Sequence, residues 1–266
     1  MSDKPAFING LPKLSLADRH KIKRNWGCAA EALRGVDRGV AKLYDAVKEA
    51  GELRKTVFIF TSDNGLFYGQ HRIPGGKVLP YGEALRLPLV IKAPRHYIGG
   101  AAPQAKIDKP VANIDLAPTI LDFAHGRPCA PGEGCRTMDG RSLMPLLAQT
   151  GSWPNDRGVL TEYNSQNAGR YATCQFAGIR TQTWSYVEHS RVVDPTTGDC
   201  VTTDQRERYD LASDPFELDN LCFGGSPASC PVDGAQVELD RRLAVLRDCS
   251  GIAGRDSLGP NHDYCE

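Results

Sequence analysis

Thr56-Val57-Phe58-Ile59-Phe60-Thr61 is the stretch that decides the fold, and Ser62-Asp63-Asn64-Gly65 follows it directly. Its residues are β-branched or aromatic and do not alternate with polar ones, which is typical of a strand covered on both faces. A second apolar run, Leu87 to Ile91, has the same character. We therefore expect two buried strands of a parallel sheet layered by helices, and an α/β fold class.

The clearest helical pattern precedes this strand, within residues 16–50. Apolar side chains recur there at spacings of three and four: Leu33, Val36, Val40, Leu43 and Val47. This spacing predicts one long helix with a single buried face, ended by Gly51. A shorter helix is predicted over residues 115–124, with Asp115 as its N-cap.

The chain changes character after residue 125. Residues 126–155 are rich in Gly, Pro and polar side chains and are interpreted as a linker. Short, half-apolar runs then predict strands over residues 159–163, 175–180, 185–189 and 208–211. An amphipathic helix is predicted over residues 236–246. We therefore expect three parts: an α/β portion at 1–125, the linker at 126–155, and a small antiparallel sheet with a packing helix at 156–266.

The composition excludes some classes of function. The chain has 266 residues, with 32 basic and 32 acidic side chains and no formal net charge at pH 7. A neutral protein has no field that attracts polyanions, so neither nucleic acid nor an anionic membrane is an expected partner. No apolar run approaches the roughly 20 residues that cross a bilayer, so no membrane span is expected. The polar start, Met1–Pro5, lacks the apolar core of a signal peptide.

Nine cysteines are many for a reducing compartment, and eight of them lie after residue 125. Disulfides are favoured over a zinc site, because no Cys-x-x-Cys pair is present. The spacing suggests short loops between Cys129 and Cys135 and between Cys222 and Cys230, although connectivity cannot be deduced from sequence. Cys28 is either a buried thiol or the partner of a cysteine on another chain.

The candidate chemistry lies directly after the first predicted strand. The Asp63 carboxylate and the Asn64 amide are hard-oxygen ligands that suit Ca²⁺ or Mg²⁺, although Asp-Asn-Gly is also a common turn. The glycine-rich loop that follows carries His71, Arg72 and Lys77. Such side chains can surround an oxyanion beside a divalent cation, although lysines in surface loops commonly have no such role.

An ordered set of motifs resembles the sulfatase family. The motifs are Ser62–Gly65, Gly69–Arg72, Gly76-Lys77, Pro80-Tyr81, Arg86–Val90, Asp115–Leu121, Asp139–Leu143 and Arg208–Glu217. The second half is most similar to the N-acetylglucosamine-6-sulfatase and heparan-sulfate sulfatase branch, on Val111–Asp115 and Leu246–Gly251. The resemblance implies part of an alkaline-phosphatase-like sheet and the hydrolysis of sulfate esters, on a sulfated sugar such as glucosamine 6-sulfate or on an aryl sulfate.

The resemblance also implies roles for individual residues. Asp63 and Asn64 would be ligands of the active-site Ca²⁺, and Lys77 would contact the substrate sulfate. His71 would line the sulfate pocket or pack beside it. The family usually has Glu directly after the tyrosine, whereas Gly82 follows Tyr81 here, which puts the cap of the local helix in question.

The family nucleophile is a formylglycine made from a Cys/Ser-x-Pro-x-Arg sequence, and this chain has none. Cys129–Glu133 and Ser152–Asp156 both lack the arginine. The family's early metal-binding aspartates, Lys and His are also missing. We therefore expect the carboxyl-terminal half of a sulfatase, with an incomplete Ca²⁺ site, exposed apolar strands and no activity without its amino-terminal half. The full-length family member would be secreted, periplasmic or lysosomal.

Two other classes of function stay open. A phosphate-ester hydrolase of the same superfamily would also use Asp63, but it needs more histidine ligands for two transition metals, and this chain has six histidines in all. A non-catalytic module that binds sulfated glycans or a partner chain would keep Lys77 without a nucleophile.

Overall fold

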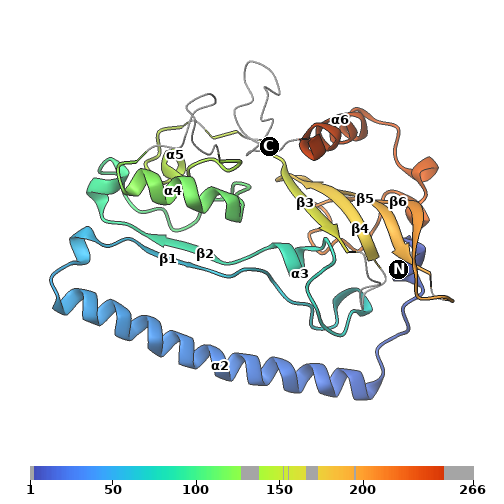
Figure 1. The fold of residues 1–266 in the computed structure, drawn as a ribbon, viewed down its shortest axis with the longest axis horizontal. Coiled ribbons are helices and arrows are strands. Elements are labelled where there is room, and N and C mark those ends of the chain that lie inside the picture. Colours follow the sequence, from blue (N-terminus) through green and yellow to red (C-terminus); the bar gives the residue numbers. More distant parts are fainter. Residues whose placement is uncertain are drawn as a thin grey trace. The chain divides into compact units, whose positions relative to one another are not determined.

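The computed structural model describes residues 3–126, 138–151, 153–154, 156–165, 173–194 and 196–248. The chain divides into two compact units. Figure 1 labels the helices and strands of both. Residues 11–100 form what we call the α2 unit, and residues 1–10 together with 101–266 form the sheet unit. The boundaries predicted from the sequence at residues 125 and 155 stay a prediction.

The α2 unit is named after its long helix, α2 (Leu16–Glu49). The helix begins at a capping box: the Asp18 N–H donates to the Ser15 hydroxyl, and the Ser15 N–H donates to the Asp18 carboxylate. It ends before Gly51, whose φ of 73° is a conformation that glycine adopts without strain. The predicted helix is confirmed. Its predicted buried face is wrong, because no residue of α2 is buried among the described residues.

The two apolar strands of the α2 unit are β1 (Phe58–Thr61) and β2 (Leu89–Lys92). They pair with each other in an antiparallel register, with Phe58 opposite Lys92, so the predicted parallel pairing is wrong. Coverage on both faces is also wrong: Phe60 is 42% exposed and Val90 59% exposed. The described residues supply no further strand to this two-stranded sheet, so its apolar side chains stay partly open to solvent.

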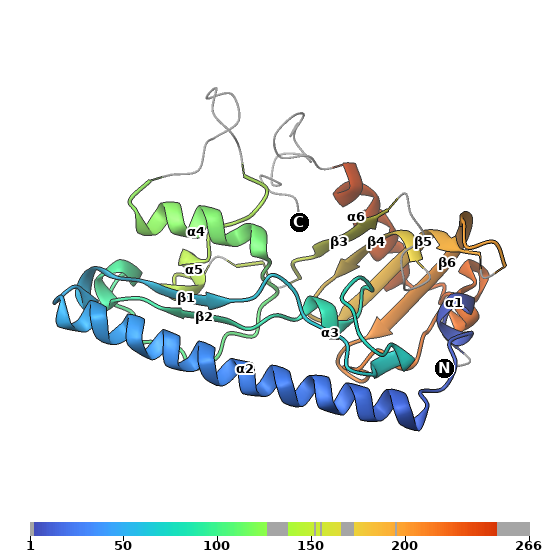
Figure 2. The ribbon, with the colours of Figure 1, turned by 60° about the horizontal axis from the view of Figure 1, so that its bottom comes forward.

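The remaining helices of the α2 unit are short. They are η1 (Leu53–Lys55), η2 (Gln70–Arg72), α3 (Gly82–Leu85) and η3 (Arg95–Ile98). Figure 2 shows α2 running alongside β1 and β2. The Tyr44 ring of the helix lies 5.4 Å from the Phe58 ring of β1. One aromatic contact therefore joins the carboxyl-terminal part of α2 to the strand that leads to the candidate site.

The sheet unit contains a four-stranded antiparallel sheet in the order β3-β4-β5-β6. Its strands are β3 (Val159–Asn164), β4 (Thr173–Arg180), β5 (Trp184–Val193) and β6 (Cys200–Asp210). The helix α6 (Gly234–Asp248) packs three buried leucines against it: Leu239, Leu243 and Leu246. They meet Ala177, Ile179 and Tyr186 of the sheet. The predicted small sheet with one packing helix is confirmed.

Shorter helices complete the sheet unit. They are α1 (Ala6–Asn9), η4 (Asn113–Asp115), α4 (Leu116–Phe123), α5 (Met144–Leu147), η5 (Phe223–Gly225) and η6 (Pro227–Ser229). Asp115 is the N-cap residue of α4, as predicted, but its side chain makes no capping hydrogen bond to that helix. Its buried carboxylate instead accepts two hydrogen bonds from Arg157, at 2.6 and 2.8 Å. The same carboxylate also accepts hydrogen bonds from the backbone N–H groups of Ala112 and Arg141, at 2.7 and 2.9 Å, so both of its oxygens are satisfied.

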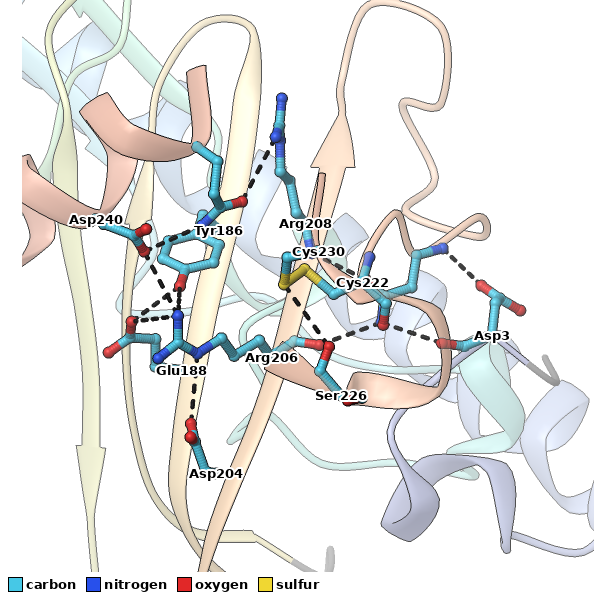
Figure 3. Close-up of a disulfide and its surroundings, with 12 residues drawn as sticks. Asp3, Tyr186, Glu188, Asp204, Arg206, Arg208, Cys222, Ser226, Cys230 and Asp240 are labelled. Atoms are coloured by element: carbon cyan, nitrogen blue, oxygen red, sulfur yellow. Dashed lines mark hydrogen bonds and ion pairs between the residues drawn. A yellow bond between two sulfur atoms is a disulfide. The ribbon is translucent and has the colours of Figure 1, made fainter. Parts of the chain in front are cut away.

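Two disulfides are present among the described residues, both in the sheet unit. Cys222–Cys230 confirms the predicted short loop (Figure 3), and Cys174–Cys200 joins the starts of β4 and β6. Cys129 and Cys135 lie outside the described residues. Cys28 is free and exposed, so its interpretation as a buried thiol is wrong. None of the described helices is both long and apolar enough to span a bilayer.

Candidate functional site

The candidate site lies where β1 ends, entirely within the α2 unit. Asp63 and Asn64 follow the last strand residue, and Lys77 returns to them from the loop 13 positions beyond Asn64. The Lys77 ammonium donates a hydrogen bond to Asn64 Oδ1 at 2.6 Å and lies 3.6 Å from Asp63 Oδ2. Three of the four predicted site residues are therefore together.

The charges at this strand end remain accessible to solvent. The side chain of Asp63 is 80% exposed and that of Lys77 is 54% exposed. Partial loss of water would raise the pKa of Asp63, but the Lys77 charge and backbone N–H groups more than offset this and hold the pKa below its usual value. The Asp63 carboxylate is therefore ionised at neutral pH, and the exposed Lys77 side chain can be reached by an anionic ligand.

Backbone contacts hold the loop that carries these residues. Gly65 N–H donates to the Ala84 carbonyl at 2.9 Å, and Phe67 N–H donates to the Gly76 carbonyl at 2.9 Å. A Cβ atom at Gly65 would lie 1.9 Å from the Glu83 carbonyl oxygen, so only glycine allows this close approach. The Asp-Asn-Gly sequence is therefore more than a free surface turn. It is pinned against α3, and the next turn of chain sets the position of Lys77.

His71 has different surroundings. It is buried, its ring stacks on Tyr81 with centroids 4.0 Å apart, and it forms a T-shaped contact with the Phe67 ring. Its Nε2 atom lies 3.4 Å from Glu83 Oε2. Its φ of 51° is unusual for a residue with a side chain. The sequence left two roles open for His71, lining the sulfate pocket or packing beside it. These contacts fit the packing role, and a direct role in a sulfate pocket stays a prediction.

Glu83 is a site neighbour whose role the sequence did not indicate. It stands two positions after Tyr81, in the first turn of α3, and no side chain caps that helix. Its carboxylate faces His71 instead. Only the departure from the family pattern at Gly82 pointed to this position, and that pattern gave no reason to pair Glu83 with His71.

The described residues supply only part of a calcium site. Ca²⁺ takes six to eight oxygen ligands, and the strand end offers the Asp63 carboxylate and the Asn64 amide oxygen. The amide oxygen already accepts a hydrogen bond from Lys77. No group of three or more His, Cys, Asp or Glu side chains that could hold a metal occurs within the described part of the chain. These residues alone therefore do not fit a complete Ca²⁺ site.

The sequence is similar to known sulfatases over most of its length. Residues 6–126 match the family described as Sulfatase, and residues 69–244 match the one described as N-sulphoglucosamine sulphohydrolase, C-terminal. The chain is 30% identical to an arylsulfatase of Chlamydomonas reinhardtii, over 94% of this chain and 38% of that protein. It is 31% identical to the N-acetylglucosamine-6-sulfatase of Homo sapiens, over 86% of this chain and 41% of that protein.

The fold is also similar to that of a solved structure, a protein in complex with its substrate D-glucosamine-2-N,6-O-disulfate. The TM-score is 0.60 and the sequence identity 26%. The match covers 81% of this chain and 38% of the other. The chain thus spans about two fifths of the length of these relatives. The predicted fold class, α/β with part of an alkaline-phosphatase-like sheet, is confirmed by this likeness. The chain belongs to the sulfatase family.

Proposed function

We propose that this chain is the carboxyl-terminal part of a sulfatase that hydrolyses sulfate esters of sugars such as glucosamine 6-sulfate. The observation that carries the proposal is the exposed Lys77 ammonium, held at the strand end by Asn64 and Asp63. Sulfated-sugar substrates are favoured because relatives named for N-acetylglucosamine-6-sulfate hydrolysis match most of the chain.

The chemistry assigned to Lys77 is electrostatic. Cleavage of a sulfate ester places negative charge on the leaving oxygen and on the sulfate oxygens. An ammonium aimed at these oxygens stabilises the charge as it develops. Asn64 fixes where the ammonium points, since its amide oxygen accepts from Nζ at 2.6 Å. Lys77 is thus positioned before substrate binds, which removes part of the cost of ordering a flexible side chain.

Asp63 and Asn64 are proposed as two of the ligands of a Ca²⁺ ion. The other ligands would come from residues outside the 266 of this sequence, because the strand end supplies too few oxygens. When bound, such an ion would add positive charge beside the sulfate. The two disulfides fit an oxidising compartment, so we propose that the complete enzyme is exported from the cytosol or resides in a lysosome.

The nucleophile is also proposed to come from outside this sequence. Hydrolysis through a covalent intermediate needs an activated nucleophile, and none of the 266 residues lies in a Cys/Ser-x-Pro-x-Arg sequence. We therefore propose that this chain alone does not turn over sulfate esters. Binding of the sulfate through Lys77 and catalysis by the complete enzyme are separate steps, and they can be tested separately.

Two assays with an aryl sulfate and added Ca²⁺ test the proposal. The chain alone should show no turnover above its Lys77→Ala variant. Mixed or co-expressed with the amino-terminal part of a related sulfatase, it should show turnover, and Lys77→Ala should lower kcat about 10²–10³-fold. Lys13→Ala, at an exposed lysine of the same unit, is the matched control. Turnover by the chain alone, or a complemented enzyme indifferent to Lys77→Ala, would contradict the proposal.

A glycan-binding module is the second candidate, because Lys77 is exposed enough to meet a sulfate without any catalysis. It predicts that the chain alone binds immobilised heparan sulfate, that moderate salt abolishes binding, and that Lys77→Ala weakens it. Salt sensitivity follows from the electrostatic nature of such contacts. Binding by the chain together with no turnover in the complemented mixture would favour this candidate over the sulfatase.

A further inference from the structure

Lys4 is fully buried in the sheet unit. Lysines are rarely fully buried unless their ammonium group is paired. Its ammonium donates a hydrogen bond to the Tyr209 hydroxyl at 2.6 Å and another to the Glu217 carbonyl. Glu207 Oε2 lies 3.7 Å from Nζ and supplies the opposite charge. Two polar acceptors and a carboxylate thus surround a group that has three donors and one positive charge.

Glu207 is the centre of this cluster and is also fully buried. His189 Nε2 lies 2.9 Å from its Oε1, and the Tyr209 hydroxyl donates to its Oε2. Burial alone would raise the pKa of Glu207, but the His189 hydrogen bond and the Lys4 charge outweigh it and lower the pKa to about 2. The carboxylate is therefore negative at neutral pH, and it offsets the charge that Lys4 brings into the protein.

The residues around Lys4 fix the register of the amino-terminal segment, which we define as residues 3–8. Asn220 N–H donates to Asp3 Oδ2 at 2.6 Å, and Gly224 N–H donates to the Asp3 carbonyl at 2.7 Å. Figure 3 shows Asp3 beside the loop that the Cys222–Cys230 disulfide closes. Phe7 meets the His189 ring at 4.8 Å, and Ile8 is fully buried.

We propose that the sheet unit contains a binding site for a lysine ammonium, built from Glu207, Tyr209 and the Glu217 carbonyl, which holds the amino-terminal segment through Lys4. The ligand class is a primary ammonium on a peptide that bends at the lysine, as residues 3–5 do before α1 begins at Ala6. An arginine guanidinium is larger and planar and does not match a site with three partners around one nitrogen.

The consequence for the chain lies in its connectivity. The α2 unit, which carries Lys77, is an insertion whose two ends join the sheet unit at residues 10–11 and 100–101. The lysine site fastens the first of these ends. The lysine site, together with the contacts of Asp3 and Ile8, therefore holds the segment of the sheet unit from which the chain enters the α2 unit.

Two experiments on the full chain test this site. In a ¹⁵N-lysine-labelled sample, NMR of the side-chain ammonium groups should show one slowly exchanging signal, which Lys4→Met removes. Amide hydrogen exchange over residues 3–10 should then quicken about tenfold or more in Lys4→Met and in Lys4→Arg, because hydrogen bonds to the charged group are lost. Lys13→Met, which removes an exposed lysine, should change neither result.

A double variant separates this site from general packing. Glu207→Gln leaves the Lys4 ammonium buried without its counter-charge, so exchange should quicken over residues 3–10 and in the sheet. The double variant Lys4→Met with Glu207→Gln removes both charges. Its amide exchange over residues 3–10 should quicken by less than the sum of the two single-variant effects. If Glu207→Gln unfolds the protein, rescue by added Lys4→Met still supports the site. A rapidly exchanging Lys4 ammonium in the parent protein, or full protection in Lys4→Arg, would overturn the proposal.

Discussion

The helices α2 and α6 have the same kind of apolar spacing but different surroundings. In α6 the leucines at 239, 243 and 246 are each at most 3% exposed, because the sheet covers them. In α2 the equivalent stripe is open, with Leu33 60% and Leu43 67% exposed. A periodic apolar face therefore predicts a helix that needs a cover, and it does not say that the same chain provides one. This difference fits the proposal that the rest of a sulfatase lies outside these residues.

The largest expected effect comes from truncating one leucine in each helix, which tests directly whether α6 is covered and α2 is open. Leu243→Ala should lower the free energy of unfolding by about 2–5 kcal/mol, because it leaves a cavity against the sheet. Leu43→Ala should change it by about 0.5 kcal/mol or less, since its side chain is already in solvent. Urea unfolding followed by tryptophan fluorescence measures both. Equal losses would show that the α2 stripe is covered in solution.

The cysteines allow a second comparison of the two units, between a disulfide of the sheet unit and the free thiol of α2. Replacing Cys174 and Cys200 by serine should cost about 3 kcal/mol, because the disulfide constrains the unfolded chain between β4 and β6. Cys28→Ser, on α2, should leave the unfolding free energy unchanged within about 0.5 kcal/mol, because the thiol is exposed and unpaired. Thermal unfolding of the two variants beside the parent protein distinguishes them. A large loss on Cys28→Ser would mean that this thiol has a partner.

Acid should destabilise the sheet unit through Glu207. Its pKa is about 2 in the folded protein against an ordinary 4.5, so the unfolded chain takes up the proton first as pH falls. The stabilisation is complete above about pH 4.5 and disappears between there and about pH 2, a loss on the order of 3 kcal/mol. Urea unfolding at a series of pH values measures it. Glu207→Gln should flatten the curve across this window, and an unchanged slope would contradict the assignment.

Features with a local cause could be predicted from the sequence. The long helix, the four short strands and the α6 helix follow from periodicity within ten to thirty residues. The strand end that carries Asp63 was also predictable, because a polar run follows an apolar one. The surroundings of these elements were not predictable in this way. β1 pairs with β2 in an antiparallel register, which no property of either strand alone specifies.

The two sites also differ in how far their contacts could be predicted from the sequence. Lys77 and Asn64 are 13 positions apart and their proximity was expected from a motif, whereas Lys4 and Tyr209 are 205 positions apart. A lysine in a polar amino-terminal stretch gives no sign that it will be buried. Its environment is made by residues of β6 and the following loop, whose own pattern indicates only a half-apolar strand. Long-range polar contacts of this kind come from tertiary packing and have no local signal.

The smallest expected effect tests whether α2 depends on its own local interactions. Ser15→Ala removes the hydroxyl that accepts from Asp18 N–H at 3.1 Å and should cost about 1 kcal/mol of helix stability. An open helix has little tertiary packing to compensate, so amide exchange in its first turns should quicken about fivefold. Exchange in α6, measured in the same sample, serves as the control and should not change. If α2 exchanged at the parent rate, contacts along its face would be holding it, and the contrast with α6 would no longer be one of covered against uncovered helices.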